Sequence, residues 1–352
     1  PLTLLGSLPV MDMPLQWAHT LMAACVWLLQ MLASWPMWQQ AEPGRWVTGL
    51  ALLGALWLLL PRGFPARWLG AVWMLPALLV TVPQPVAGAL WVSAIDVGQG
   101  LAVLVRTAHH ALLFDAGPRY NSASDSGNRI VEPYLRGEGV THLDDMVLSH
   151  DDNDHTGGAT SLLRDVPVAA VITSLPVTHD IFVHYPNLVQ RCEAGQNWNW
   201  DGVNFFILYP TTSSYGDVSL KDNHRSCVLK ISSAGGSVLL SADIEGDDER
   251  QLLATTPLML RANLLIAPHH GSRTSSTPGF IAAVQPEITL FTVGYHNRYG
   301  HPRSDVVSRY RDAGSALWRS DYDGLMDIHF TPETRPQINS WRRLQQHYWQ
   351  DG

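Results

Sequence analysis

Apolar residues are distributed very unevenly along the chain. Three long apolar blocks lie at its start, at roughly Leu15–Trp38, Trp46–Leu60 and Trp68–Val82. The first block is long enough for a helix that crosses a bilayer, whereas the other two, at about 15 residues, fall short of the ~20 that such a helix needs. We therefore expect transmembrane helices here. The second and third blocks either span the membrane as short helices or form a re-entrant pair. A buried helical hairpin of a soluble protein is the alternative.

After residue 86 the pattern changes to short apolar runs that alternate with helical stretches. Short runs rich in branched apolar residues predict strands, and longer periodic stretches predict helices. The expected strands are Leu90–Val97, Leu101–Arg106, Ala111–Phe114, Met146–Ser149, Ala169–Thr173, Val203–Leu208, Cys227–Ile231, Val238–Ser241, Leu264–Ala267, Ile288–Val293, Ala316–Arg319 and Leu325–Phe330. The expected helices are Asn128–Gly137, Gly157–Arg164, Gly246–Ala254, Pro278–Val284 and Ser304–Asp312.

This change of pattern predicts two domains, 1–86 in the membrane and 87–352 outside it. The second is an α/β domain in which two sheets are flanked by helices. The tail after Pro336, which is basic and aromatic, is expected to be a solvated terminal helix.

Charge follows the same division. The chain has 23 Lys and Arg against 31 Asp and Glu, and residues 1–86 contain very few of either. This balance excludes a disordered chain and a strongly basic nucleic-acid binder. Arg62 and Arg67 lie between the second and third apolar blocks, so the positive-inside rule puts that connection in the cytoplasm and the residues after Val82 on the outer side. Because the chain starts at Pro1 rather than Met, we expect it to be the C-terminal part of a longer polytopic protein.

The three cysteines are too few for a disulfide framework. Cys25 lies in an apolar block and is expected to be a small core residue. Cys192 and Cys227 can pair if the domain faces an oxidising compartment, but separate buried thiols are the commoner case and are what we expect.

Histidines and acids gather after three of the predicted strands. The run Ser149-His-Asp-Asp-Asn-Asp-His155 follows one strand, Asp243 follows a second, and His269 and His270 follow a third. A lone histidine of this kind is usually a surface or core residue, and Asp243 alone fits a helix N-cap. Together, however, imidazoles and carboxylates at three strand ends predict a site for divalent first-row metals.

At these residues the sequence resembles the metallo-β-lactamase superfamily over almost the whole of 90–332. The 150–155 cluster resembles the family's His-x-His-x-Asp-His motif, Asp243 its bridging Asp, and His269 or His270 its last His ligand. Three further motifs resemble the C-terminal domain of ComEC-type proteins, the DNA-uptake channels of natural competence: Asp96-Val-Gly-Gln-Gly100, Pro268-His-His-Gly-Ser272 and Tyr299-Gly-His-Pro302.

The resemblance implies a metallo-β-lactamase-like αββα sandwich preceded by transmembrane helices. It implies a metal-dependent phosphodiesterase or nuclease domain on the outer face of a bacterial inner membrane, which degrades one DNA strand while the other is transported. The implied partners are the single strand in transit, the membrane, other DNA-uptake components and the rest of the same polytopic chain. A non-catalytic domain that guides DNA and a metal hydrolase of envelope phosphoesters are the alternatives.

The resemblance also assigns roles to residues. The first metal position would be held by His150, Asp152 and Asp243 with water, and the second by Asp154, His155, Asp243 and one of His269 and His270. Asp152 stands in the place of the second family His, and His224 is displaced from the place of the middle one. This oxygen-rich set favours Mn²⁺ over Zn²⁺, with one or two ions bound.

The remaining candidate residues concern catalysis and substrate. Asp154 would orient or deprotonate the attacking water. His301 is a candidate general acid or phosphate contact, with a structural turn histidine as the even alternative. Asp115 is expected to support the ligand loop. The candidate substrate contacts are Ser226, Ser272, Asn223 and Arg273, and the arginines near the motif loops that could track phosphates are Arg119, Arg129, Arg136, Arg273, Arg298 and Arg303.

Overall fold

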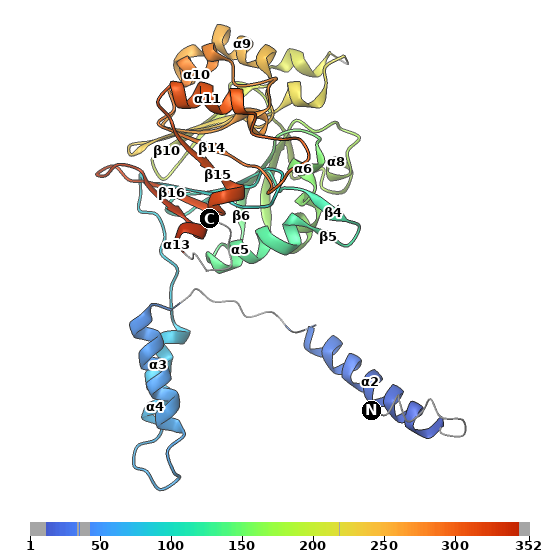
Figure 1. The fold of residues 1–352 in the computed structure, drawn as a ribbon, viewed down its shortest axis with the longest axis vertical. Coiled ribbons are helices and arrows are strands. Elements are labelled where there is room, and N and C mark those ends of the chain that lie inside the picture. The colour runs from blue at the N-terminus through green and yellow to red at the C-terminus, as the bar shows by residue number, and fades with distance from the viewer. Residues whose placement is uncertain (1–11, 34, 36–42, 218, 345–352) are drawn as a thin grey trace. The chain divides into compact units, whose positions relative to one another are not determined.

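The computed structural model describes residues 12–33, 35, 43–217 and 219–344 (Figure 1). The chain divides into two compact units, Pro1–Leu78 and Leu79–Gly352. The described helices of the first unit are α2 (Asp12–Ala33), α3 (Arg45–Leu58) and α4 (Leu69–Leu78). Of all described helices, only α2 is long and apolar enough, over Met13–Ala33, to be a candidate membrane span.

The two shorter apolar blocks form a helical hairpin. A Cβ atom on Gly54 of α3 would lie 2.4 Å from the carbonyl oxygen of Gly70 in α4, and the reverse contact has the same length. Glycines at this crossing let the two backbones approach closely, as small residues do between membrane helices. The rings of Trp57 and Trp73, with centroids 5.3 Å apart, pack beside this crossing.

The second unit contains two large mixed sheets. The first has eight strands in the order β17-β16-β1-β2-β3-β6-β7-β8. Its neighbours are antiparallel from β17 to β3 and parallel from β3 to β8. Its strands are β1 (Leu90–Ala94), β2 (Val103–Arg106), β3 (Ala111–Phe114), β6 (Leu143–Leu148), β7 (Val168–Thr173), β8 (Val189–Arg191), β16 (Met326–Phe330) and β17 (Gln337–Ser340).

The second sheet has seven strands in the order β15-β14-β13-β12-β11-β10-β9. The neighbours from β12 to β15 are parallel and the others antiparallel. Its strands are β9 (Asn197–Trp200), β10 (Val203–Tyr209), β11 (Val228–Ser233), β12 (Gly236–Leu240), β13 (Leu264–Ile266), β14 (Ile288–Phe291) and β15 (Ala316–Arg319). A separate small hairpin pairs β4 (Arg119–Asn121) with β5 (Ser124–Asp125).

Three apolar cores show how the layers pack. Val92 of the first sheet and Phe205 of the second belong to one core between the sheets. Leu135 and Leu162, on helices beside the first sheet, share a second core with Leu113 of β3. A third core joins the second sheet to its own helices, which lie on the outer face in Figure 1. The predicted αββα sandwich is therefore confirmed.

The described helices of this unit are short. Beside the first sheet lie a π-helical turn (Gly127–Val131), α5 (Glu132–Gly137), α6 (Asn153–Thr156), α7 (Ala159–Asp165) and α8 (Asp180–His184). Beside the second lie α9 (Gly246–Thr255), α10 (Pro278–Val284) and α11 (Ser304–Asp312), and near the end come α12 (Ser320–Asp323) and α13 (Trp341–Leu344).

The prediction of a solvated helix after Pro336 is wrong for residues 337–340, whereas Trp341–Leu344 do form a short, mostly exposed helix, α13. Residues 337–340 instead form β17, an edge strand that pairs antiparallel with β16. Ile338 packs against the core between the sheets, and Arg342 donates a hydrogen bond to Asp96 Oδ2 at 2.8 Å. Pairing satisfies the backbone of the segment and buries an apolar side chain, which a solvated helix would not do. The residues after Leu344 lie outside the described chain.

The expectation for the cysteines is also wrong. Cys192 and Cys227 form a disulfide, and both are fully buried in the core between the sheets. The end of β8 and the start of β11 meet there, so the bond joins the two sheets. Cys25 is exposed on α2 rather than placed in a core.

This disulfide predicts the number of reactive thiols. Cell membranes are broken in the presence of an alkylating agent and the protein is then denatured. Only Cys25 should be labelled under these conditions, whereas reduction before alkylation should allow all three cysteines to be labelled. Mass spectrometry of the labelled chain counts the modified residues. A Cys25→Ser chain, the control, should show none without reduction, and labelling of all three cysteines without reductant would contradict the pairing.

Candidate metal centre

The predicted ligands lie where strands of both sheets end. Asp115 and His150 directly follow β3 and β6, which are parallel neighbours in the first sheet. Asp243 and His270 follow β12 and β13, which are parallel neighbours in the second. Parallel strands bring their carboxyl ends to one edge of a sheet, so four loops can aim their side chains at one place.

The structure brings these side chains together in two overlapping groups. Ligand atoms of His150, His155 and Asp243 all lie within 4.8 Å of one another, and so do those of Asp154, His155 and His270. His155 Nε2 is 3.2 Å from Asp243 Oδ1, and His270 Nε2 is 3.5 Å from the same oxygen. Two adjacent metal positions that share the carboxylate of Asp243 fit this arrangement, with His155 available to only one of them because its Nε2 has a single lone pair.

The hydrogen bonds on the far side of each ring fix where the imidazole lone pairs point. His270 Nδ1 lies 2.8 Å from the carbonyl oxygen of Thr292, which can only accept, so Nδ1 carries the proton. His155 Nδ1 likewise lies 2.8 Å from the carboxylate of Asp115. The two Nε2 atoms, 3.2 Å apart, therefore both present lone pairs to each other and to Asp243. Such a buried arrangement needs positive charge between the groups, supplied either by a proton on one Nε2 or by a metal ion.

The neighbouring charges shift the pKa values of the proposed ligands. Burial by itself would lower the pKa of His155, but the carboxylates of Asp243 and Asp115 raise it well above its usual range. Burial would raise the pKa of Asp243, yet the neighbouring His155 and His270 hold it well below the usual value. The pKa of Asp154 is also lowered, against the effect of burial, chiefly by His270 and His155. The site thus favours bound positive charge, whether it is carried by a proton or by a metal ion.

His150 has an orphaned nitrogen that points to the same conclusion. The hydroxyl of Ser149 donates to Asp115 Oδ2 at 2.8 Å, so it accepts the Nδ1 proton of His150 at 2.9 Å. Nε2 of His150 is buried without a hydrogen-bond partner among the described residues and lies 3.3 Å from Asp152 Oδ2. The side chain of Asp152 is 46% exposed, so a cation placed here would remain open to solvent on that side.

Asp115 holds the ligand loop, as the sequence led us to expect. It is fully buried and accepts hydrogen bonds from the backbone and hydroxyl of Ser149 at 2.7 and 2.8 Å, besides the one from His155. Its φ of 58° is a left-handed conformation that non-glycine residues seldom adopt, and His269 (49°) and His270 (53°) share it. Backbone strain of this kind is characteristic of functional sites.

The two adjacent histidines have different surroundings. His270 is buried within the second group. His269 is partly exposed, with Nε2 3.6 Å from Asp243 Oδ2 and Nδ1 3.4 Å from Glu245 Oε1. Glu245, not Asp243, is the N-cap of α9, so the N-cap reading of Asp243 is wrong. Of the two histidines, the geometry favours His270 as the ligand.

The predicted substrate contacts do not gather in the same way. Ser226 is fully buried and its hydroxyl accepts from the backbone N–H of Asp243 at 3.3 Å, so it supports a ligand. Ser272 bonds Thr274 within its own loop. Arg273 is exposed, 3.6 Å from Asp305. Asn223 lies in a 3₁₀ turn, where its carbonyl oxygen accepts from Ser226 N–H at 3.0 Å.

Two further histidines flank the site. His224 pairs with Asp248 at 2.9 Å and belongs to neither ligand group. The ring of His301 lies 5.9 Å from that of His269, and its Nδ1 is buried with no hydrogen-bond partner in the described chain. Burial, with the nearby His270 and His269, lowers the pKa of His301 to about 4.

A hollow of about 440 Å³ adjoins Asp154. The candidates Asp154 and Arg298 line it, but its tyrosines were not among the residues drawn from the sequence. Its walls include Tyr120 on the β4–β5 hairpin and Arg298 and Tyr299 on the loop before α11. The motif Tyr299-Gly-His-Pro302 contains one of these tyrosines, but only its histidine was interpreted as a functional residue.

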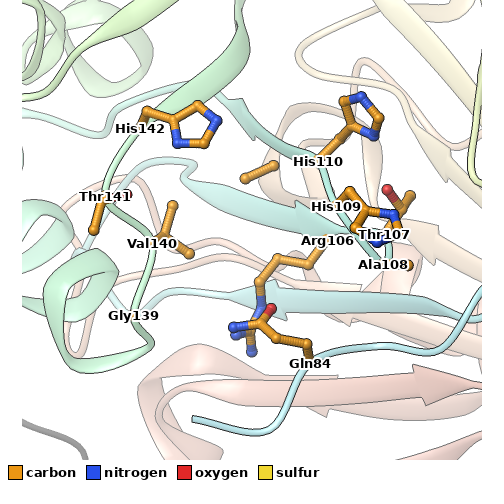
Figure 2. A pocket seen from close by; sticks show the side chains of 11 residues that line it. Gln84, Arg106, Thr107, Ala108, His109, His110, Gly139, Val140, Thr141 and His142 are labelled. Carbon is orange, nitrogen blue, oxygen red and sulfur yellow. The ribbon is translucent and has the colours of Figure 1, made fainter. Parts of the chain in front are cut away.

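A second hollow, of about 180 Å³, lies outside both ligand groups (Figure 2). His110 and His142 line it from different segments, together with Arg106. Asp201 accepts hydrogen bonds from Thr107 Oγ1 at 2.6 Å and His109 N–H at 2.8 Å, so it ties the β2–β3 turn to the β9–β10 turn. The ring of His110 also contacts Asp201, with its Nδ1 3.2 Å from Oδ2, so this histidine has a structural role.

Comparison with known proteins agrees with this geometry. Residues 95–180 match the sequence profile of the metallo-β-lactamase superfamily. The Competence protein ComA of Neisseria gonorrhoeae is 35% identical over 99% of this chain and 48% of its own length. Recombination protein 2 of Haemophilus influenzae is 34% identical over 68% of this chain and 29% of its own length.

The chain belongs to the ComEC-type competence proteins. It spans about half the length, or less, of these curated relatives. The second unit of this ComEC-type chain has the metallo-β-lactamase fold. A solved metallo-β-lactamase fold protein, YhfI of Bacillus subtilis, is 13% identical with a TM-score of 0.42, over 65% of this chain and 95% of that one.

The support that Asp115 gives to His155 predicts weaker metal binding in Asp115→Asn. The amide cannot accept all the hydrogen bonds that the carboxylate accepts, so the ring loses its fixed orientation. Affinity for a divalent metal should fall by roughly 10- to 100-fold, measured by competition with a chromophoric chelator. Asp248→Asn, which breaks another buried Asp–His pair, is the matched control, and an equal loss there would contradict the assignment.

The different surroundings of the adjacent histidines predict different metal contents in the ComEC-type chain. His270→Ala removes an atom of the second ligand group and should lower the bound metal after dialysis, measured by elemental analysis. His269→Ala should retain the content of the unchanged chain. The reverse pattern would show that the two histidines exchange roles when metal binds.

Proposed function

We propose that the second unit is a metal-dependent phosphodiesterase, a nuclease, that belongs to a membrane DNA-uptake channel and degrades one DNA strand while the other is transported. The competence-protein relatives support a role in DNA uptake, and the metallo-β-lactamase fold supports a metal hydrolase. The observation that carries the proposal is the meeting of His155, His270 and Asp243 with their lone pairs directed at one point.

The donors present fit a divalent metal. Imidazole nitrogens come from His150, His155 and His270, and carboxylate oxygens from Asp154 and Asp243. Asp152 adds a further carboxylate near His150. Because carboxylates form a large share of the donors and no thiolate contributes, we propose Mn²⁺, with Zn²⁺ as the alternative, and one or two ions.

The chain's own residues can then be given roles in phosphodiester hydrolysis. A divalent cation supplies Lewis acidity, which makes water a nucleophile near neutral pH and neutralises charge on the phosphate. Asp154, at the border between the ligand group and the hollow, orients the attacking water or takes its proton. His301, beside His269, contacts the phosphate. Because its pKa is lowered to about 4, it would protonate the leaving oxygen only if a bound phosphate raised that pKa.

The location of the domain forms part of the proposal. We place it on the periplasmic side of a bacterial inner membrane, in a multi-pass protein, because of Arg62 and Arg67 in the preceding connection. The disulfide between Cys192 and Cys227 supports this side, since disulfides persist in oxidising compartments. The acidic net charge of −8 disfavours unaided DNA binding, so the rest of the channel and other uptake components would deliver the strand.

A non-catalytic DNA-guiding role is the second candidate. It is favoured by the open, carboxylate-lined side of the first metal position at Asp152 and by the placement of His224 away from the centre. If metal were bound weakly at that position, catalysis would be lost, whereas a metal held by the second group would still attract phosphate. A metal hydrolase of envelope phosphoesters is a third candidate that shares the proposed location.

A cleavage assay tests the proposal. The full chain, purified in detergent and stripped of metal, is supplied with Mn²⁺ or Zn²⁺ and given end-labelled single- and double-stranded DNA. We expect metal-dependent cleavage, and a loss on the order of 10³-fold in Asp243→Ala, because the lost metal contributes several kcal/mol to the transition state. Asp217→Ala changes an exposed carboxylate that, within the described part of the chain, accepts hydrogen bonds only from Ser219. This variant should cleave normally.

The other outcomes separate the alternatives. Stoichiometric metal without DNA cleavage would overturn the nuclease and favour envelope phosphoesters as substrates. A chain that binds no metal would overturn both hydrolase functions and leave the guiding role. Faster cleavage with Zn²⁺ than with Mn²⁺ would overturn only the metal assignment.

A further inference from the structure

The hollow beside Asp154 is lined by two tyrosines from separate segments. Tyr120, on the β4–β5 hairpin, and Tyr299, on the loop before α11, are both 44% exposed. Val97 and Gly98 also line the hollow, and Asp154 borders it. The hollow is therefore continuous with the proposed metal centre.

We propose that this hollow is the subsite for a nucleoside next to the phosphate being cleaved, and that Tyr120 and Tyr299 hold its base by stacking. The inference rests on the proposed nuclease function and adds to it the residues that engage the substrate beside the metal. A base can enter such a site only when it is unpaired, so the occupant is a single strand or a frayed end.

The wall that carries Tyr120 is fastened to the metal-binding loop. Asn153 bonds the backbone of Arg119 twice, with its side-chain oxygen accepting and its nitrogen donating, each at 3.3 Å. The hydroxyl of Tyr120 donates to the carbonyl oxygen of Val97 at 3.1 Å. Because Asn153 directly precedes Asp154, the distance from the tyrosine ring to the metal centre is fixed by one short segment.

The segment that carries Tyr299 is equally well held. Asn297 donates to the carbonyl oxygen of His301 at 2.7 Å and accepts from its N–H at 3.0 Å, which closes the loop that contains Tyr299. The side-chain oxygen of Gln99 accepts from the N–H of Gly294 at 3.2 Å, so the Asp96–Gly100 motif anchors this loop. Aromatic rings on rigid loops lose little entropy when they bind.

The polar ends of both tyrosines are already engaged. Tyr120 donates to Val97, and the Tyr299 hydroxyl accepts from Arg298 Nη2 at 2.8 Å. The exposed part of each side chain is therefore available for stacking rather than needed for polar contacts inside the protein. Every base offers an aromatic face, so the contact tolerates any sequence, as degradation of an arbitrary strand requires.

Each tyrosine also has an arginine beside it. Arg129 Cζ lies 5.9 Å from the Tyr120 ring centroid, and Arg298 Cζ lies 4.9 Å from that of Tyr299. Neither arginine forms an ion pair with a carboxylate in the described part of the chain, although the domain is rich in acids. Unneutralised cations next to aromatic rings are the pattern of single-strand binding grooves, where they contact the backbone phosphates.

Dinucleotides with a single phosphodiester bond test this subsite, because the scissile bond is then fixed. Three substrates are compared in the full chain with its preferred metal: one with both bases, and two that lack the base on one or the other side. Tyr299→Ala and Tyr120→Ala should each lower kcat/KM for the complete dinucleotide by roughly 5- to 150-fold, mainly through KM, since stacking is worth about 1–3 kcal/mol per base.

The matched substrates and variants make the result specific. A dinucleotide that lacks the base bound in the hollow should show the same decrease in kcat/KM as the tyrosine variants show with the complete dinucleotide. Combining a tyrosine variant with this substrate should give no further decrease. Tyr299→Phe should retain most of the activity because the ring remains. Tyr322→Ala is the control, since Tyr322 is 60% exposed under Arg319 and does not line the hollow.

A binding measurement keeps this inference separate from the nuclease proposal. A single-stranded oligonucleotide that contains 2-aminopurine, added with Ca²⁺ in place of the catalytic metal, should be quenched by the unchanged chain and not by Tyr299→Ala. Quenching without any cleavage would overturn the nuclease but support the subsite. Cleavage that ignores both tyrosines and the flanking bases, or the absence of quenching, would overturn the subsite.

Discussion

The arrangement of buried lone pairs around His155 is the constraint on which the rest of the centre depends. His155 and His270 each donate their Nδ1 proton to an oxygen behind the ring, and both therefore present Nε2 to Asp243. Electron pairs confined in this way repel one another unless a cation lies between them. The surrounding loops make the arrangement possible by holding the rings where they would not otherwise stay.

Holding the rings in this arrangement requires unfavourable backbone conformations in the loops that follow the strands. Asp115, Ala242, His269 and His270 all have left-handed backbone conformations, each of which is unfavourable for a residue with a side chain. They persist because each loop is fixed by further contacts, such as His269 N–H bonding the Ala242 carbonyl oxygen at 2.9 Å. A cation at the centre would join loops from both sheets, so metal binding and the packing of the sandwich should support each other.

The disulfide and the two tyrosine walls extend this organisation on either side of the centre. Cys227 N–H bonds the Ser149 carbonyl oxygen at 3.0 Å, which places the inter-sheet disulfide directly behind the ligand loop. In front, Asn153 connects the same loop to the wall with Tyr120. One segment, 149–154, thus links the core, the proposed metal ligands and the proposed substrate subsite.

The sequence alone determined which residues form the scaffold and which types of ligand it carries. Helix Pro278–Val284 and strand Ala111–Phe114 agree to the residue, because local apolar periodicity reflects burial that the sandwich also requires. The edge strand β17, the β4–β5 hairpin and the disulfide escaped it. β4 and β17 pair with neighbouring segments, but they are short and contain few buried residues, so they carry little apolar pattern. The disulfide depends on a partner 35 residues away. Tertiary structure alone decided that His270 rather than His269 is buried with Asp154 and His155 in a ligand group, and that two tyrosines border one hollow. Adjacent residues of the same type, such as His269 and His270, cannot be distinguished by sequence. Only the positions of the loops from different strands determine which of their atoms meet.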